Sequence, residues 1–176
     1  SLADKPTVFA MSRPLAGKDF SGGIKAISHD DIRWQYCDIK AITLLPSVLL
    51  RHRAQTAGAK EAILFRDGLV TEGAASNVFV CKDGQIMTPP RDQRVLPGIT
   101  RDLLVEVLQQ SNLGCVETDI SRQQLLEADE IWITSSTWEI VPVIRLDDQP
   151  VANGEVGPLW RQANELYQQF KRDYCQ

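Results

Sequence analysis

The chain has 176 residues, 43% of them hydrophobic and 24% charged, which is typical of a globular domain large enough to bury a core. Its formal net charge is -4 and it has no basic cluster, so a nucleic-acid partner is not expected. No apolar run is long enough to cross a membrane and no signal peptide opens the chain, so neither a membrane partner nor secretion is expected.

The four cysteines and two histidines do not suggest a metal site. No two cysteines form a Cys-x-x-Cys pair, which removes the usual zinc and thioredoxin-like motifs. His29 and His52 look unpaired and are interpreted as structural or surface residues. We expect the cysteines to be reduced and mostly buried, as in a cytoplasmic protein.

The first predicted elements are short strands joined by loops. Residues 7–11 predict a strand, and the glycines and the proline within residues 13–23 predict a loop. Residues 24–28 predict a second strand. Residues 30–43 have no clean period and are interpreted as a strand end that passes into a loop carrying Lys40.

A helix and two hairpins follow. Pro46 is placed to open the helix, because its fixed φ and missing N–H do least harm there, and Gly58 is placed to end it. Asp-Gly pairs at 67–68 and 83–84 separate apolar runs, and such pairs favour tight turns with positive φ. The strands of these hairpins are predicted at residues 62–65, 69–71, 77–81 and 85–88.

The last part of the chain alternates helices with strands. A helix with an apolar stripe begins after Gly98, and Ser121 with Gln124 fits a capping box for a short helix. Gly157 and Pro158 begin the final helix. Further strands are predicted at residues 116–120, 131–134 and 140–146.

This order of elements predicts the fold class. Interleaved strands and helices favour an α/β domain. The two hairpins require antiparallel pairs, so a purely parallel sheet is not expected. The sequence therefore predicts a mixed, strongly curved, barrel-like sheet with hairpins, covered by helices.

Lys40 is the first candidate for chemistry. Most lysines are solvated surface groups, and this is the simplest interpretation. Its neighbours include Ile39, Ala41 and Ile42, however, and this apolar run predicts partial burial. Burial disfavours the ammonium form, and the free amine can condense with an aldehyde and later move a proton.

Glu72 is the second candidate, a lone acid at a predicted strand end that is followed by the small residues 73–76. Small residues let a flat ring approach the backbone closely. A carboxylate beside a pyridine nitrogen keeps that nitrogen protonated, which makes the ring an electron sink. An acid that caps a turn is the competing interpretation, and Glu72 taken alone favours it.

Two polar segments are candidate phosphate cradles. Gly98, Ile99 and Thr100 open a predicted helix, whose first N–H groups lack partners at the positive end of the dipole. The hydroxyl run at residues 134–137 follows a predicted strand and adds donors. An ordinary helix start and a polar loop are the competing interpretations. Arg101, in the same helical turn, is interpreted as a structural residue that bonds nearby carbonyls.

Taken together and in this order, these segments resemble those of the fold-type IV pyridoxal-phosphate (PLP) enzymes, and most of all the D-amino-acid aminotransferases. The resemblance runs from about residue 7 to the last helix and is strongest over residues 31–40. The segments at residues 71–79, 96–101 and 134–143 follow in the family's order. The set is specific for the family and less specific for the substrate.

The resemblance implies PLP-dependent transfer of an amino group between a D-amino acid and a 2-oxo acid by a ping-pong route. It implies that Lys40 forms the internal aldimine and moves the proton, and that Glu72 pairs with the pyridine nitrogen. It places Asn77 in the pocket wall and Leu96 against one face of the ring. The residues implied at the phosphate are Ile99, Thr100 and Ser136, and Gly98 and Ser135 are also expected to bind the cofactor.

Two departures from the family limit these expectations. Ala74 and Ala75 stand where relatives often carry hydroxyl residues, so some polar contacts are expected to be absent. The chain also begins near the join between the family's two domains. Residues 1–23 are therefore expected to be an interdomain linker with the first strand, and residues 24–176 the cofactor-binding domain, without the small N-terminal domain.

The resemblance also implies partners. The N-terminal domain of relatives supplies an arginine for the phosphate and groups that hold the substrate carboxylate. Without it, this chain alone is expected to bind PLP weakly and to turn over poorly or not at all. Family members are usually homodimers, and a homodimer is expected here.

Two alternatives stay open. One is another fold-type IV activity, either a branched-chain aminotransferase or an aminodeoxychorismate lyase, although residues 31–40 lean towards the D-amino-acid group. The other is a stable domain without a working site, in which Lys40 binds no cofactor.

Overall fold

The structure, a computed structural model, describes residues 7–14 and 19–174. Its helices are α1 (Leu45–Thr56), α2 (Ile99–Gln110), α3 (Arg122–Leu126) and α4 (Pro158–Tyr174). Its strands are β1 (Ile24–Asp30), β2 (Glu61–Arg66), β3 (Leu69–Gly73), β4 (Asn77–Lys82), β5 (Gln85–Thr88), β6 (Val116–Glu117), β7 (Glu130–Ser135), β8 (Glu139–Leu146) and β9 (Gln149–Pro150). No helix in these two ranges is long and apolar enough to cross a membrane.

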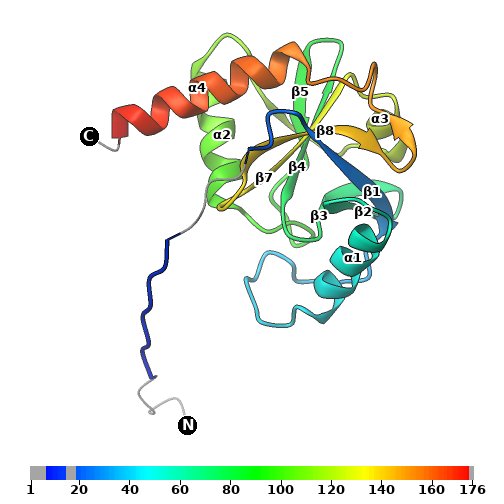
Figure 1. The fold of residues 1–176 in the computed structure, drawn as a ribbon, viewed down its shortest axis with the longest axis vertical. Coiled ribbons are helices and arrows are strands. Elements are labelled where there is room, and N and C mark those ends of the chain that lie inside the picture. The colour runs from blue at the N-terminus through cyan, green and yellow to red at the C-terminus, as the bar shows by residue number, and fades with distance from the viewer. Residues whose placement is uncertain (1–6, 15–18, 175–176) are drawn as a thin grey trace.

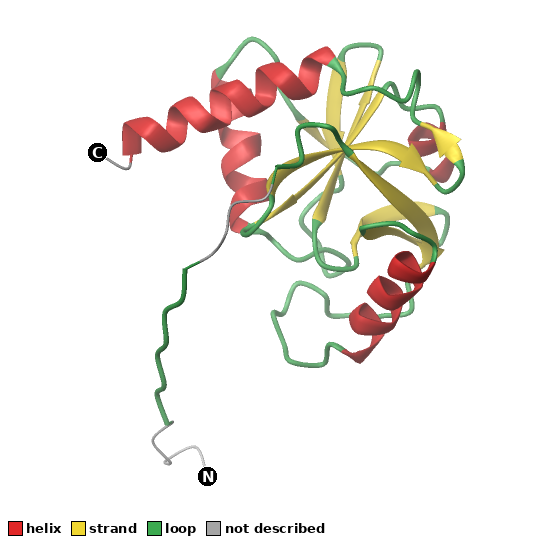
Figure 2. Ribbon diagram, in the orientation of Figure 1, coloured by secondary structure: helices red, strands yellow, loops and turns green. Residues whose placement is uncertain are grey.

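The strands form one curled sheet with helices around it, as Figure 1 and Figure 2 show. Within the described residues the sheet has nine strands in the order β3-β2-β1-β8-β7-β4-β5-β6, with β9 paired to β8. β1 lies between the β2–β3 hairpin and the remaining strands, and it runs parallel to both of its neighbours, β2 and β8. The β2–β3, β4–β5, β4–β7 and β7–β8 pairs are antiparallel. The predicted mixed, strongly curved α/β sheet is therefore confirmed.

Both Asp-Gly turns form as predicted. Asp67 has a φ of 52° and Gly68 a φ of 78°, and the corresponding values at Asp83 and Gly84 are 49° and 80°. Positive φ at both central residues is the backbone twist that suits a two-residue hairpin. The capping box predicted at the start of α3 is also present.

The central strands bury both of their faces. On β4, Val78 and Val80 join one apolar cluster, whereas Phe79 and Cys81 join another. The second cluster lies between the sheet and the helices α2 and α4, and includes Trp160 of α4. Side chains alternate between the faces of a strand, so burial on both faces explains why these segments are almost continuously apolar.

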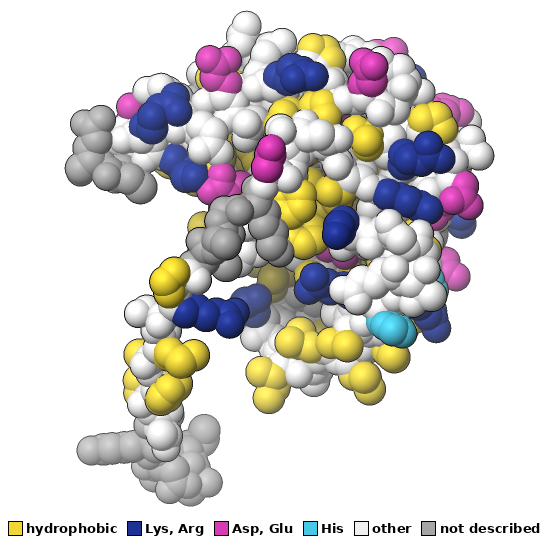
Figure 3. Space-filling model, viewed as in Figure 1, with side chains coloured by type: hydrophobic (Ala, Val, Ile, Leu, Met, Phe, Trp, Pro, Cys, Tyr) yellow, Lys and Arg dark blue, Asp and Glu magenta, His cyan; other side chains and the backbone are white. Residues whose placement is uncertain are grey.

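The helix α1 covers the sheet near β2, and its buried apolar face is narrower than those of α2 and α4. Leu50 and Ala54 are buried against it, but Leu45 is 68% and Val48 57% exposed. In Figure 3 hydrophobic side chains gather along the lower edge of the folded body, above the level of the N-terminal end, where Figure 1 places α1 and the loop before it. This side of the molecule therefore presents an apolar surface to solvent.

Two predicted strands differ from the structure. Residues 7–11 form no strand and are exposed, because no backbone among the described residues lies against them to satisfy their N–H and C=O groups. The strand predicted at residues 116–120 shortens to β6, because the chain then turns to the β3 side, where Val70 N donates to Ile120 O at 2.8 Å. Within the predicted loop at residues 13–23, residues 15–18 lie outside the described ranges.

Candidate active site

One cavity gathers every site residue expected from the sequence. It has a volume of about 670 Å³ and is lined by the loop before α1, α1 itself, the β3–β4 turn, the start of α2 and the β7–β8 turn. The expected residues on its wall are Lys40, Glu72, Asn77, Leu96, Gly98, Ile99, Thr100, Ser135 and Ser136. These residues come from well-separated parts of the chain, so the cavity exists only in the folded domain.

Lys40 lies on the cavity wall but is exposed, so the expected partial burial is wrong for this structure. Its neighbours Ile39 and Ile42 are 54% and 96% exposed. The apolar run around the lysine therefore faces solvent rather than a core. The amine nevertheless shares its cavity with Glu72 and with both polar turns.

Glu72 lies near the end of β3 and is only 4% exposed. Its Oε2 accepts hydrogen bonds from Asn77 Nδ2 at 3.1 Å and from Leu96 N at 3.0 Å, and its Oε1 accepts one from Arg33 Nη1. A carboxylate has about four acceptor sites, roughly two on each oxygen. A donor that enters the cavity therefore finds room at Oε1, beside Arg33.

Arg33 is the site residue that the sequence did not reveal. Its Nε and Nη2 each donate to Asp31 at 2.8 Å, while Nη1 pairs with Glu72. The Asp31 carboxylate is fully buried and also contacts Arg66 Nη2 at 3.0 Å and Thr71 Oγ1 at 3.1 Å. A buried acid such as Glu72 requires a charged or hydrogen-bonding partner, so the sequence indicated that a partner exists. It did not indicate that this partner is Arg33, because the two residues are far apart in the chain.

Burial and the ion pair with Arg33 shift the pKa of Glu72 in opposite directions. Removal from water raises the pKa of Glu72 to about 7, and the positive charge of Arg33 limits the rise. Burial would likewise raise the pKa of Asp31, but its bonds to Arg33 and the charge of Arg66 lower it instead. Glu72 is therefore poised near neutral pH, where a further positive charge in the cavity favours its carboxylate form.

The helix α2 begins at the cavity with no side chain capping its first amides. Gly98 precedes it in an extended conformation, and Ile99 and Thr100 follow on the cavity wall. A Cβ at Gly98 would come within 2.2 Å of Asn77 Oδ1. Glycine is therefore needed if this helix start and the Asn77–Glu72 contact are to coexist. Uncovered amides at a helix start attract anions.

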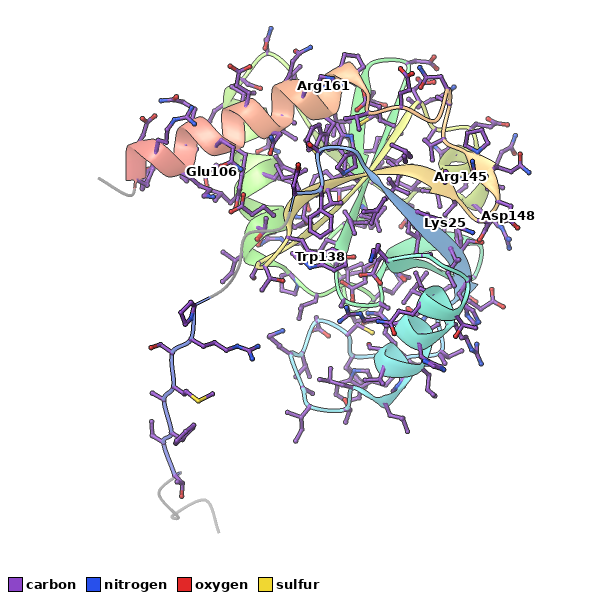
Figure 4. The ribbon with its side chains drawn as sticks, in the orientation of Figure 1. Lys25, Glu106, Trp138, Arg145, Asp148 and Arg161 are labelled. Atoms are coloured by element: carbon purple, nitrogen blue, oxygen red, sulfur yellow. The ribbon has the colours of Figure 1, made fainter. Side chains whose placement is uncertain are left out.

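The β7–β8 turn adds hydroxyl groups to the same wall. Residues 135–137 line the cavity, and the buried Thr134 Oγ1 has no hydrogen-bond partner among the described residues. Trp138 of this turn, labelled in Figure 4, packs against Phe20 with ring centroids 5.0 Å apart. A buried hydroxyl without a partner is costly, so we expect a polar ligand or a water molecule to bind at this part of the wall.

Two other polar residues are occupied by structural contacts. Arg101 is 1% exposed and its Nη2 donates to Glu117 Oε2 at 2.6 Å and to a backbone carbonyl, as expected for a structural residue. His29 is paired, contrary to expectation. Its Nδ1 lies 2.7 Å from Asp30 O, and its Nε2 contacts Arg53.

The described cysteines are free thiols. Cys37 and Cys81 are buried, and burial raises the pKa of the partly buried Cys115 to about 12. The fourth, Cys175, lies outside the described residues. A thiol with so high a pKa is poorly nucleophilic at neutral pH, so Cys115 is not a candidate for the chemistry of the site.

Known proteins are similar to this chain over most of its length. The D-alanine aminotransferase of Bacillus licheniformis is 42% identical over 165 residues, which is 93% of this chain and 58% of the relative. The D-alanine aminotransferase of Listeria monocytogenes (strain 10403S) is 38% identical over 161 residues, 92% of this chain and 56% of the relative. The chain thus spans a little over half the length of these relatives.

Solved structures share its fold. The branched-chain amino acid aminotransferase of Escherichia coli has a TM-score of 0.72 at 31% identity, covering 82% of this chain and 50% of that one. The Thermobaculum terrenum branched-chain enzyme, solved in its PLP form, has a TM-score of 0.78 at 26% identity and covers 84% and 50%. The sequence signature of the family described as amino-transferase class IV matches residues 2–146. Family signature, relatives and fold agree, and the chain belongs to the class IV aminotransferases.

Proposed function

We propose that this chain is the cofactor-bearing part of a PLP-dependent aminotransferase that moves an amino group between a D-amino acid and a 2-oxo acid. The observation that carries the proposal is the convergence of Lys40, Glu72, the uncapped start of α2 and the hydroxyl-bearing β7–β8 turn on one cavity. Identities of 42% and 38% to two D-alanine aminotransferases support the D-amino-acid class of substrate.

The cavity wall fits the polar groups of PLP. Lys40 offers an amine for the aldehyde, and Glu72 keeps an acceptor site on Oε1 for the pyridine N–H. The amides at the start of α2, the hydroxyl of Thr100 and the turn that contains Ser136 offer donors for the phosphate. The unpartnered Thr134 Oγ1 is an independent sign that this wall is built for a polar ligand.

Each residue then has a defined task. Bound PLP supplies an electron sink for the bond that breaks at the substrate carbon. Lys40 Nζ holds the cofactor and is the base that moves the proton. Glu72 holds the ring N–H, and Arg33 favours the charged form of Glu72 and holds it in place. Leu96 packs against one face of the ring. Asn77 Nδ2 donates to the Glu72 carboxylate and to Leu96 O, and so holds both residues in place.

The remaining parts of the site are proposed to come from outside residues 24–176, which form the cofactor-binding domain. The chain spans 58% and 56% of two relatives, and we propose that a small N-terminal domain of the whole enzyme holds the substrate carboxylate. The exposed Ile42 and Leu45 support a protein partner on that side, and we propose a homodimer located in the cytoplasm. Alone, the chain is expected to bind PLP weakly.

Absorbance spectroscopy tests the task of Lys40. PLP is added to the protein and to its Lys40→Ala variant, and the spectral change that marks attachment of the aldehyde to an amine is followed. Lys60→Ala, which removes an exposed lysine away from the cavity, is the matched control. The change is expected in the unaltered protein and in the control but not in Lys40→Ala. An equal change in all three removes Lys40 from the proposed site.

Turnover by the full-length enzyme tests the substrate class. With D-alanine and 2-oxoglutarate we expect pyruvate and D-glutamate. The structural similarity to branched-chain enzymes at 31% and 26% identity favours one alternative, for which L-leucine would be the faster donor. Pyruvate released from aminodeoxychorismate would instead indicate a lyase.

A further inference from the structure

Arg51 is a positively charged residue on the cavity wall that has no task in the proposed function. It lies on α1, is partly exposed, and lines the cavity together with Ser47, one helical turn earlier. Residues four positions apart share one face of a helix, so both side chains belong to the face of α1 at the cavity. Neither side chain forms a hydrogen bond or an ion pair with any residue that the structure describes. This side of the cavity therefore carries donors without an acceptor.

The other charges on the cavity wall do not compensate Arg51. Within the described chain, the charged residues that line the cavity are Arg33, Lys40, Arg51 and Glu72. The acid among them, Glu72, is already paired with Arg33. Lys40 is the amine proposed to hold the cofactor. A guanidinium stays charged at physiological pH and offers five N–H donors in a planar fork that matches a carboxylate. Arg51 is therefore available to an anionic ligand.

A structural pairing of Arg51 with Glu61 is the competing explanation. Burial raises the pKa of Glu61, and the positive charge of Arg51 opposes the rise. Glu61 does not line the cavity, however, and its two oxygens already accept from Ala62 N at 2.8 Å and from Ser76 Oγ at 2.9 Å. No salt bridge joins Glu61 to Arg51. The two charges influence each other at a distance, and the donors of Arg51 stay free.

The β3–β4 turn leaves space beside this cation. Leu50, next to Arg51 in α1, belongs to the same buried cluster as Ala74, so the helix and the turn pack together. Ala75 of this turn is exposed and lines the cavity. Its methyl group is small and makes no hydrogen bond. Polar recognition beside this turn therefore depends on Ser47 and Arg51.

The chemistry of the proposed reaction indicates which anion would bind there. The phosphate of the cofactor is assigned to the start of α2 and to the β7–β8 turn, which are different elements. The carboxylate beside the reacting carbon is assigned to the N-terminal domain. The anion that remains is the second carboxylate of a dicarboxylic substrate, which both 2-oxoglutarate and D-glutamate carry.

We propose that Arg51, assisted by Ser47, binds the side-chain carboxylate of dicarboxylic substrates and so determines a preference for acidic over apolar side chains. The guanidinium pairs with the carboxylate, and the serine hydroxyl donates a further hydrogen bond. The inference rests on the proposed function, because it names the residues that would recognise one of its two substrate pairs.

Binding of two unreactive acids to the full-length enzyme tests this inference. Glutarate and pentanoate both have five carbon atoms, but only glutarate has a second carboxylate. The ratio of their affinities, measured by calorimetry, isolates the contribution of that group. Arg51→Met is expected to lower the ratio of glutarate to pentanoate affinity roughly tenfold, which is the size of one lost hydrogen bond between charged groups. Arg51→Lys keeps the charge and should recover most of the ratio.

Matched variants on the same helix complete the test. Ser47→Ala should lower the ratio about threefold, as for the loss of a neutral donor. Arg53→Met is the control, because Arg53 contacts His29 and does not line the cavity, and it should leave the ratio unchanged. In turnover, Arg51→Met should lower the ratio of kcat/KM for D-glutamate to that for D-alanine by roughly tenfold.

Three results would overturn the inference. Equal losses for glutarate and pentanoate in Arg51→Met would mean that Arg51 supports the fold or holds a carboxylate common to both acids. An unchanged ratio in Arg51→Met, or glutarate that binds the unaltered enzyme no more tightly than pentanoate, would also overturn it. A PLP spectrum that does not depend on Lys40 would instead contradict the proposed function, and glutarate binding is measured whether or not the enzyme transfers amino groups.

Discussion

Arg33 and Glu72, 39 positions apart in the chain, form a buried ion pair on the wall of the cavity. The guanidinium cannot turn away, because two of its nitrogens are held by Asp31. Asp31 is itself held by Arg66. The carboxylate proposed to face the pyridine nitrogen is thus the last member of a series of alternating charges, and its ionisation depends on the first three.

Removing the guanidinium should make Glu72 a weaker acid. In Arg33→Met the burial of Glu72 persists while its nearest positive charge is lost, so its pKa is expected to rise above 7. Carbon-13 NMR of the labelled glutamate carboxyls, followed through a pH titration, measures this directly. Arg91→Met, which breaks an exposed ion pair with Asp102, is the control and should leave the Glu72 titration unchanged. A Glu72 pKa that stays in place in Arg33→Met contradicts the electrostatic assignment.

The raised pKa of Glu72 also predicts how stability depends on pH. The folded value of about 7 lies above the ordinary value of 4.5, so between these values the folded state binds more protons than the unfolded state. The free energy of unfolding should therefore fall as pH rises from 4.5 to 7, by up to about 3 kcal/mol from this group. The lowered pKa of Asp31 acts in a different window, below its ordinary 3.8.

Urea denaturation at a series of pH values checks this prediction. Glu72→Gln removes the titrating group, so its curve between pH 4.5 and 7 should be flatter than that of the unaltered protein. Glu61, whose pKa is also raised by burial, keeps its own share of the slope. Parallel curves for the two proteins would show that Glu72 does not titrate in this range.

Glu130 is predicted to be essential for α4. Its carboxylate accepts from Leu159 N, Trp160 N and Trp132 Nε1, so Glu130→Ala leaves three buried or partly buried donors unpaired. A loss of about 2 kcal/mol or more in unfolding free energy is expected, measured by urea denaturation. Glu165→Ala, an exposed acid on the same helix, is the control and should change stability little. Equal losses in the two variants would contradict the prediction that the Glu130 carboxylate caps the start of α4.

A methyl group at position 98 should disturb the site without unfolding the domain. In Gly98→Ala the new Cβ would lie 2.2 Å from Asn77 Oδ1, so Asn77 must move and lose its contact with Glu72. Loss of one hydrogen bond to a charged group corresponds to roughly tenfold weaker PLP binding. Gly22→Ala, where the added Cβ meets nothing within 4 Å, is the control. Titration with PLP distinguishes the two, and equal affinities would contradict the prediction.

Much of the fold was predictable because its causes are local. The Asp-Gly pairs specify hairpins through the backbone conformations that glycine and aspartate tolerate. The box of Ser121 and Gln124 specifies a helix start through two hydrogen bonds within four residues. The expected site residues were found through their order along the chain, which resembles a known family, and the structure brings them to one cavity.

The features that were not predicted depend on contacts between distant residues. Whether the apolar run around Lys40 is buried depends on what packs against Ile39 and Ile42, and in this structure they face solvent. The pairing of Arg33 with Glu72 and of Lys171 with Glu139 joins segments 39 and 32 positions apart. Residue spacing along one element contains no information about such pairs.

The parallel pairing of β1 with both β2 and β8 has a consequence for synthesis on the ribosome. Residues 24–30 emerge well before their second neighbour, residues 139–146. Until then one long edge of the nascent strand is open to other chains, which makes the growing polypeptide vulnerable to aggregation. Closing so large a loop late also predicts slow final folding, and the cavity of the candidate active site cannot be complete before then.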